Sequence, residues 1–169
     1  MSPALLAPAL GLGLVLLIGA ALHDLAVRTV PNCFPATLVA LGLVARALAG
    51  DLLPGLAVAL LVFGGAALLW LRGIMGGGDV KLLGAVALVA PPAKCPDLLL
   101  MTALCGGVLA MLYLALSYLV ARPECGRRHT LLGRLLKAER WRLSRRGPLP
   151  YATAIAGGSL ISLLPLLAG

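Results

Sequence analysis

The sequence predicts an all-α, polytopic membrane protein with about six transmembrane helices. Of its 169 residues, 61% are hydrophobic and 12% are charged, and the mean hydropathy is +1.04. A soluble domain of this length also buries a core, but it does not carry several apolar runs long enough to span a bilayer, which takes about 20 residues each. Six apolar runs make the whole chain, residues 1–169, a single membrane-embedded domain in this interpretation. The runs are 4–22, 35–49, 52–71, 80–90, 98–120 and 150–167.

The first run, 4–22, is uninterrupted and stops at His23-Asp24. No basic residue precedes it and no small-residue cleavage site with a soluble domain follows it, so we expect a retained helix rather than a signal peptide. The second and fourth runs are short for a bilayer of about 30 Å and require support from flanking residues or local thinning. For the fourth run, which Pro91-Pro92 closes, the alternative is a re-entrant segment, and the count would then be five.

The distribution of Lys and Arg predicts the orientation of the chain. One set of alternating connections holds twelve basic residues, and the other set holds only Arg46 and Lys94. Cytoplasmic loops collect basic residues, so the amino terminus lies outside and the loops after the first, third and fifth runs lie in the cytoplasm. With an even number of spans, both termini are outside. The twelve are Arg28, Arg72, Lys81 and the nine basic residues from Arg122 to Arg146.

The predicted cytoplasmic loop at 121–149 carries nearly all of the net charge of +8, because it holds nine basic and only two acidic side chains. A strongly basic chain raises the possibility of a nucleic-acid partner. The loop lacks the aromatic platform on which bases would stack, so we expect no nucleic acid. Its stretch "LLGRLLKAERWRLSRR" interleaves leucines with basic residues, which suits a helix lying on anionic headgroups of the lipid bilayer.

Cysteine and histidine spacing predicts no metal site and no cofactor. The four cysteines form no C-x-x-C pair and fall in different compartments on this topology, and the two histidines are far apart in the sequence. The cysteines are at 33, 95, 105 and 125, and the histidines are at 23 and 129.

Two of the six carboxylates border apolar runs at the predicted cytoplasmic edge. Asp24 follows the first run and Asp79 precedes the fourth. An ionisable group at such a position is costly, so a functional role is the default expectation. The alternative is a helix-end role, with Asp79 capping the helix that starts at Val80. The other carboxylates are expected to be solvated charges: Asp51 and Asp97 in external connections, Glu124 and Glu139 in the basic loop.

Three consecutive glycines precede Asp79. Without side chains they allow unusual backbone angles and the close approach of another chain, as a site that admits an extended peptide requires; a flexible hinge is the alternative. Lys81 lies two positions after Asp79, so on a regular helix it would not face that carboxylate. We expect it to contact headgroups or substrate. The predicted substrate-binding residues are Gly76, Gly77, Gly78 and Lys81.

At 76–81, "GGGDVK" matches the G-x-G-D pattern of membrane-embedded aspartyl proteases, and with its lysine it resembles the type IV prepilin peptidases. In that family the first catalytic aspartate follows an early helix and precedes a Pro-Asn turn, as Asp24 precedes Pro31-Asn32. The segment "PLPYATAIAGG" at 148–158 is similar to the Pro-Tyr-containing start of the family's last helix. The resemblance covers nearly the whole chain and implies that Asp24 and Asp79 are the catalytic residues.

The resemblance implies a membrane aspartic endopeptidase, a hydrolase that cleaves the leader of type IV or Flp-like prepilins at the cytoplasmic face of the bacterial inner membrane. Its partner would be a prepilin or pilin-like precursor of a pilus or secretion system. One ionised carboxyl would take a proton from water while a protonated one polarises the scissile carbonyl; the sequence does not assign these two roles. Larger members carry an amino-terminal extension with two C-x-x-C pairs, associated with amino-methylation. This chain begins at the first helix, so we expect the short, peptidase-only type of the Flp or tight-adherence systems.

Three alternatives compete with this interpretation. A transporter could use paired acids as a proton relay, but the chain has no internal repeat and its acids lie at an edge rather than at mid-membrane. Presenilin-like intramembrane proteases share G-x-G-D, yet they carry the first aspartate in a Tyr-Asp motif that is absent here. A non-catalytic membrane assembly protein that keeps the same fold stays open.

Overall fold

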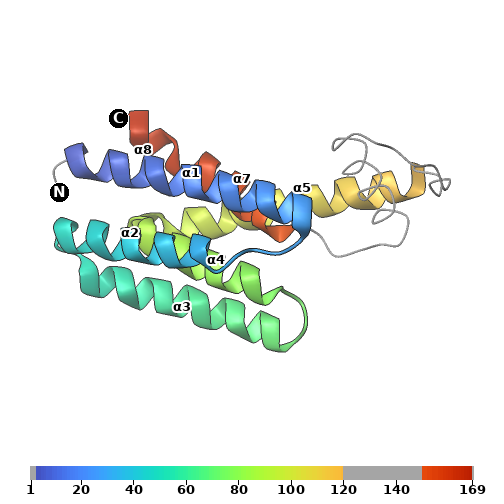
Figure 1. Ribbon diagram of the computed structural model, residues 1–169, viewed down its shortest axis with the longest axis horizontal. Helices are drawn as coiled ribbons and strands as arrows, with labels where there is room; N and C mark the ends of the chain where they lie inside the picture. The colour runs from blue at the N-terminus through green and yellow to red at the C-terminus, as the bar shows by residue number, and fades with distance from the viewer. Residues whose placement is uncertain (1–2, 120–149, 169) are drawn as a thin grey trace. The chain divides into compact units, whose positions relative to one another are not determined.

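The computed structural model describes residues 3–119 and 150–168, and within these ranges the chain is helical and has no strand (Figure 1). The all-α prediction is therefore confirmed for the described residues. Each of the six apolar runs coincides with a helix, and the last run divides into two helices. The predicted basic loop at 121–149 lies outside the described residues. The elements are α1 (Pro3–Val27), α2 (Cys33–Ala49), α3 (Leu52–Leu71), α4 (Gly77–Val89), the 3₁₀ helix η1 (Pro92–Lys94), α5 (Cys95–Leu119), α7 (Tyr151–Leu163) and α8 (Pro165–Ala168).

The chain divides into two compact units. The first comprises residues 1–105 and 150–169, and the second comprises 106–149. The candidate site described below belongs to the first unit. In it, the start of α1 and the short α8 lie at the same end of the helix bundle (Figure 1). That the whole chain is one domain stays a prediction.

Helix α4 is the central element of the first unit. It packs against α2 and α3 on one side and against α7 and α1 on the other, and every residue from Leu82 to Ala90 is buried. A helix that is apolar all round is expected to lie inside a protein rather than at its surface. Its 13 residues span only about 20 Å. Because neighbouring helices enclose it, α4 needs little contact with lipid, and this explains why the fourth run is so short.

Three helical segments are long and apolar enough to cross a membrane, counting only the part of the chain that the structure describes. Their outward surfaces carry large apolar side chains, such as Leu53 on α3 and Met111 on α5, which are among the most exposed residues. Such contiguous apolar surface is unfavourable in water and is accommodated by lipid. The segments are Ala7–Val27, Leu52–Leu71 and Pro92–Leu116.

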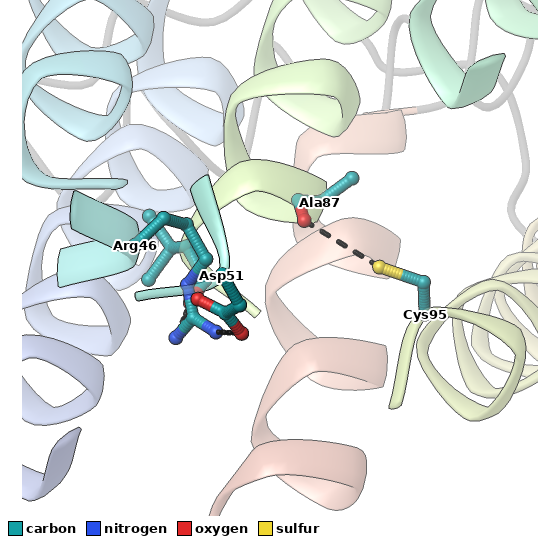
Figure 2. Close-up of polar contacts among 5 residues, drawn as sticks. Arg46, Asp51, Ala87 and Cys95 are labelled. Carbon is teal, nitrogen blue, oxygen red and sulfur yellow. Dashed lines mark hydrogen bonds and ion pairs between the residues drawn. The ribbon is translucent and has the colours of Figure 1, made fainter. Parts of the chain in front are cut away.

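A buried arginine joins α2, α3 and the carboxyl end of α4. Arg46 has no exposed surface, and its Nη1 donates a hydrogen bond to Asp51 Oδ2 at 2.8 Å (Figure 2). Its Nη2 donates to the backbone oxygen of Val89 at 3.4 Å, near the end of α4. The aliphatic part of Arg46 lies against Gly55 of α3, where an added Cβ would come within 2.9 Å of it.

The expectation that Asp51 is an ordinary solvated charge is therefore wrong. It is the partner of a buried guanidinium, and the ion pair contributes to holding three helices together. By contrast, Asp97 is exposed and pairs with the partly exposed Lys94 at 3.1 Å, as predicted for a surface charge. Nearby, Cys95 Sγ donates to the backbone oxygen of Ala87 at 3.4 Å, which links the start of α5 to α4 (Figure 2).

The crossing of α5 and α7 depends on a glycine. A side chain at Gly158 would overlap the backbone of Thr102, so only glycine allows the two helices to approach this closely. This contact helps to fix α7, whose first residue, Tyr151, lies at the candidate site.

Candidate active site

Asp24 lies in the last turn of α1 and is 7% exposed. The helix continues to Val27, so Asp24 is inside the helix rather than after it. The next residue, Arg28, has a positive φ of 61°, and its N–H donates to the Asp24 backbone oxygen at 2.7 Å. The structure thus presents a buried carboxylate at the end of α1, on the side where the α1–α2 loop begins.

Asp79 lies in the first turn of α4, two residues after Gly77 begins the helix. Gly76 occupies the N-cap position, and its backbone forms a hydrogen bond with the Asp79 carboxylate. A carboxylate three residues after the cap commonly binds the cap N–H in this way. The helix begins at Gly77 and not at Val80, so the alternative in which Asp79 is itself the cap of a helix that starts at Val80 is wrong. An added Cβ at Gly76 would lie only 2.8 Å from Asp79 Oδ2. A side chain at position 76 would therefore crowd the Asp79 carboxylate.

The two aspartates lie within electrostatic reach of each other. Asp79 immediately precedes the fourth apolar run, and the pKa of its carboxyl is raised from 3.8 to about 6. Burial is the largest cause, the charge of Asp24 also raises the pKa, and the hydrogen bond from the Gly76 backbone offsets part of the rise. Two carboxylates that share a site do not both ionise easily, so the pair retains one proton to higher pH than isolated carboxyls do.

Tyr151 is a third polar side chain at this end of the bundle. It begins α7, is partly buried, and lies close enough to Asp79 to interact with its charge. No role was predicted for Tyr151 from the sequence. The available signal was the Pro-Tyr pattern within 148–158, which indicated the start of a helix but not which carboxylate the tyrosine would face.

The α1–α2 loop, residues 28–32, follows the helix that carries Asp24 and contacts α4, the helix that carries Asp79. His23 Nδ1 lies 2.8 Å from the backbone oxygen of Thr29, which holds the loop to α1. On the other side, Lys81 Nζ donates to Asn32 Oδ1 at 3.1 Å, which holds the loop to α4. Lys81 was expected to contact headgroups or substrate, and in this structure its described partner is the loop.

The glycines before Asp79 allow close packing by other parts of this chain. An added Cβ at Gly78 would lie 3.3 Å from Val30 Cβ, and one at Gly77 would lie 3.4 Å from Trp70 Nε1. None of the three has a positive φ; the described glycines that do are Gly50 and Gly73. The absence of a side chain at these positions therefore allows other parts of the chain to pack closely against α4. Contact of these glycines with substrate stays a prediction.

Among the described residues, no group of three or more His, Cys, Asp or Glu side chains could hold a metal ion. The site consists of two neighbouring carboxylates, a tyrosine and a lysine–asparagine pair. Paired carboxyls whose environment separates their pKa values are suited to general acid–base catalysis. The fold and site thus define a helical, lipid-compatible protein with a two-carboxylate centre.

The type IV leader peptidase family has a sequence model that matches residues 11–111 of this chain. The chain belongs to this family, and the prediction made from the sequence is confirmed. The matched residues include Asp24 and Asp79 but end before Tyr151. Comparisons with curated proteins and with solved structures gave no match. Membership supports a peptidase of the leader-peptidase type.

Proposed function

We propose that this chain is a membrane aspartic endopeptidase that removes leader peptides from prepilin or pilin-like precursors, with Asp24 and Asp79 as its catalytic residues. The observation that carries the proposal is the placement of two carboxylates, Asp24 buried at the end of α1 and Asp79 in the first turn of α4, within electrostatic reach of each other. Family membership supports the peptidase class. Two neighbouring carboxyls, one with a raised pKa, are what the aspartic mechanism requires.

In this mechanism the ionised carboxyl takes a proton from water as the water oxygen attacks the scissile carbonyl carbon. The protonated carboxyl donates its proton to the carbonyl oxygen, which gives a neutral tetrahedral intermediate. Collapse of the intermediate breaks the C–N bond, and a proton moves to the leaving amine nitrogen. Each step needs one protonated and one ionised carboxyl, which is the state that a coupled pair favours.

The proposed cleavage side is the cytoplasmic face of the bacterial inner membrane. Twelve of the fourteen basic residues belong to the connections on the side of the two aspartates, and cytoplasmic loops collect such residues. A precursor with a charged leader in the cytoplasm and an apolar helix in the bilayer would present its junction at this level.

Direct cleavage of a precursor in lipid vesicles tests the proposed function. The purified chain is reconstituted with a precursor that has a basic leader ending in glycine and an apolar helix of about 20 residues, and mass spectrometry identifies the products. We expect release of the intact leader. A folded protein that leaves the precursor uncut would contradict the proposal and favour a non-catalytic assembly protein.

The orientation is tested with topology reporters. Because of the bias in basic residues, a reporter fused near Arg127 is expected to be active only as a cytoplasmic reporter. One fused near Lys94 is expected to be active only as an external reporter. Reversed signals at both positions would put both aspartates in the wrong compartment and overturn the assignment.

The coupling of the two aspartates predicts a change in titration. In Asp24→Asn, the pKa of Asp79 is expected to fall below about 6, because the like charge is removed, but to stay above 3.8 because burial persists. Isotope-edited infrared spectra of the carboxyl C=O band in nanodiscs measure this. Asp97→Asn, an exposed carboxylate, is the control and should leave the Asp79 titration unchanged. An unchanged pKa in Asp24→Asn would show that the two carboxyls do not interact.

The raised pKa of Asp79 also predicts how stability varies with pH. The folded pKa exceeds the unfolded value of 3.8, so the stability due to the Asp79 proton is complete below pH 3.8. It is lost as pH rises through about 6. Asp79→Asn should remove this part of the pH dependence in unfolding experiments. The same slope in the variant and in the unsubstituted chain would contradict the assignment.

A further inference from the structure

The α1–α2 loop contacts residues next to both aspartates, beginning with the neighbour of Asp24. His23 immediately precedes Asp24, and its Nδ1 lies 2.8 Å from the backbone oxygen of Thr29 in the loop. A carbonyl oxygen only accepts hydrogen bonds, so Nδ1 carries the hydrogen in this contact. The protonated ring and one neutral tautomer both carry that hydrogen, so the contact does not require a charged ring. The loop is thus tied to α1 at the residue before the first aspartate.

The same loop contacts α4 on both sides of Asp79. An added Cβ at Gly78 would lie 3.3 Å from Val30 Cβ, so the valine packs against the backbone of the residue before Asp79. Two residues after Asp79, Lys81 Nζ donates to Asn32 Oδ1 at 3.1 Å. The loop is therefore tied to α4 just before and just after the second aspartate.

The side chain of Asn32 serves this contact with α4 rather than its own helix. Asn32 occupies the N-cap position of α2, where asparagine commonly accepts a hydrogen bond from a backbone N–H of the first turn. Its side chain makes no capping bond, and its Oδ1 accepts from Lys81 instead. Loss of the bond to Lys81 should therefore have little effect on how α2 begins.

The backbone of the loop adopts an uncommon conformation where it leaves α1. Arg28 has a φ of 61°, which residues with a Cβ rarely adopt. Such conformations persist where the surrounding contacts impose them. The contacts of the loop with His23, Gly78 and Lys81 keep it against the two helices in this form.

Direct packing between α1 and α4 is slight. Helix α1 packs mainly against α7 and α2, whereas α4 packs mainly against α2 and α3. The distance between a side chain at the end of α1 and one at the start of α4 is therefore not set by contact of these two helices alone. Carboxylates of like charge repel each other, so an additional link at this level is needed to keep them close.

We propose that Asn32 and Lys81 are positioning residues, whose hydrogen bond holds the α1–α2 loop against α4 and thereby keeps Asp24 and Asp79 at the spacing that peptide cleavage requires. This inference rests on the proposed function and deepens it, because it gives Lys81 a role in the geometry of the site rather than in contact with substrate or headgroups. Loss of the bond should then lower kcat, because a displacement of about 1 Å can slow a reaction about a hundredfold.

Variants that remove the bond test this role. Asn32→Ala and Lys81→Met change exposed residues, so both proteins should fold. In each, the kcat for leader release in vesicles should fall at least about tenfold with little change in KM, and the double variant should be no worse than either single one. The matched controls are Thr37→Val, at an exposed hydroxyl that bonds within α2, and Lys94→Met, at a lysine that donates to α5. Both controls should cleave normally.

A lysine that binds the precursor directly would give a different result. Lys81→Met would then raise KM, and Asn32→Ala would change neither constant, which would overturn the proposal. Faster cleavage by Asn32→Ala would also overturn it, because the loop would then be a cover that has to open before the precursor enters.

Titration of Asp79 tests the spacing without catalysis. Asn32→Ala removes no charge, so the pKa of Asp79 should fall below about 6, because a more distant Asp24 raises that pKa less. In the Asp24→Asn background the same change should have no further effect, and Thr37→Val should have none in either background. Infrared spectra of the carboxyl C=O band in nanodiscs measure these values.

The two measurements separate this inference from the proposed function. A precursor left uncut by the unsubstituted chain, together with the expected fall of the Asp79 pKa in Asn32→Ala, would contradict the peptidase proposal and support the positioning role. An unchanged Asp79 pKa in Asn32→Ala would overturn the positioning role alone, whatever the effect of that variant on cleavage.

Discussion

Asp24→Asn and Asp79→Asn are each expected to abolish leader cleavage while leaving the protein folded in the membrane. Asparagine keeps the size of the side chain and much of its hydrogen bonding, but it neither accepts the proton from water nor donates one to the carbonyl oxygen. The expected loss is at least about a thousandfold in kcat, within the range seen when one member of a catalytic unit is removed. The rate of leader release in vesicles measures it.

The double variant is expected to be little worse than either single variant. Residues that act as one unit are strongly non-additive, because removing either member already removes the shared function. Asp97→Asn is the matched control, since Asp97 is an exposed aspartate that pairs only with Lys94 among the described side chains. If Asp24→Asn keeps near-normal turnover, Asp79 does not work with Asp24, and the two-carboxylate mechanism is wrong for this chain.

Composition was sufficient to predict the helices. Each long apolar run became a helix because the backbone of an apolar segment satisfies its hydrogen bonds internally when it is helical. Together with the bias in basic residues, the runs also singled out Asp24 and Asp79 as the two carboxylates at run ends on the predicted cytoplasmic side, and their catalytic role stays a proposal. What the sequence did not predict is that α4 lies at the centre. This position depends on which helices enclose it, and its composition alone is equally compatible with a re-entrant segment.

The polar contacts within the bundle were harder to predict, because each joins residues that are distant in the sequence. Tyr151 comes within electrostatic reach of Asp79 only because α7 packs beside α4. Lys81 meets Asn32 only because Val30 lies against Gly78 and brings the loop to α4. The sequence places Arg46 in an external connection because the residue is charged. Nothing in the neighbouring sequence indicates that Gly55 leaves space for its side chain.

The burial of Arg46 leads to the second large expected effect, on stability rather than on catalysis. Asp51→Asn removes the only ion-pair partner that the described residues give to this guanidinium. A buried charge that loses its partner typically costs about 3–5 kcal/mol. Because the Asp51 side chain is 34% exposed, we expect the lower end of that range. Reversible unfolding in mixed micelles measures the change, and Asp97→Asn, at an exposed pair, should leave the free energy of unfolding nearly unchanged.

Comparing the losses of stability in the two single variants of this pair distinguishes a buried ion pair from a surface one. Arg46→Met keeps much of the aliphatic volume against Gly55 and leaves behind only the partly exposed Asp51, which water can solvate, so it should cost less than Asp51→Asn. In the double variant Arg46→Met/Asp51→Asn, no charge remains buried, and its stability should recover to near that of Arg46→Met alone. The cycle of four proteins isolates this coupling. Equal and additive effects of the two single changes would mean that Arg46 is solvated, and that Asp51 is the ordinary external charge that its sequence context suggested.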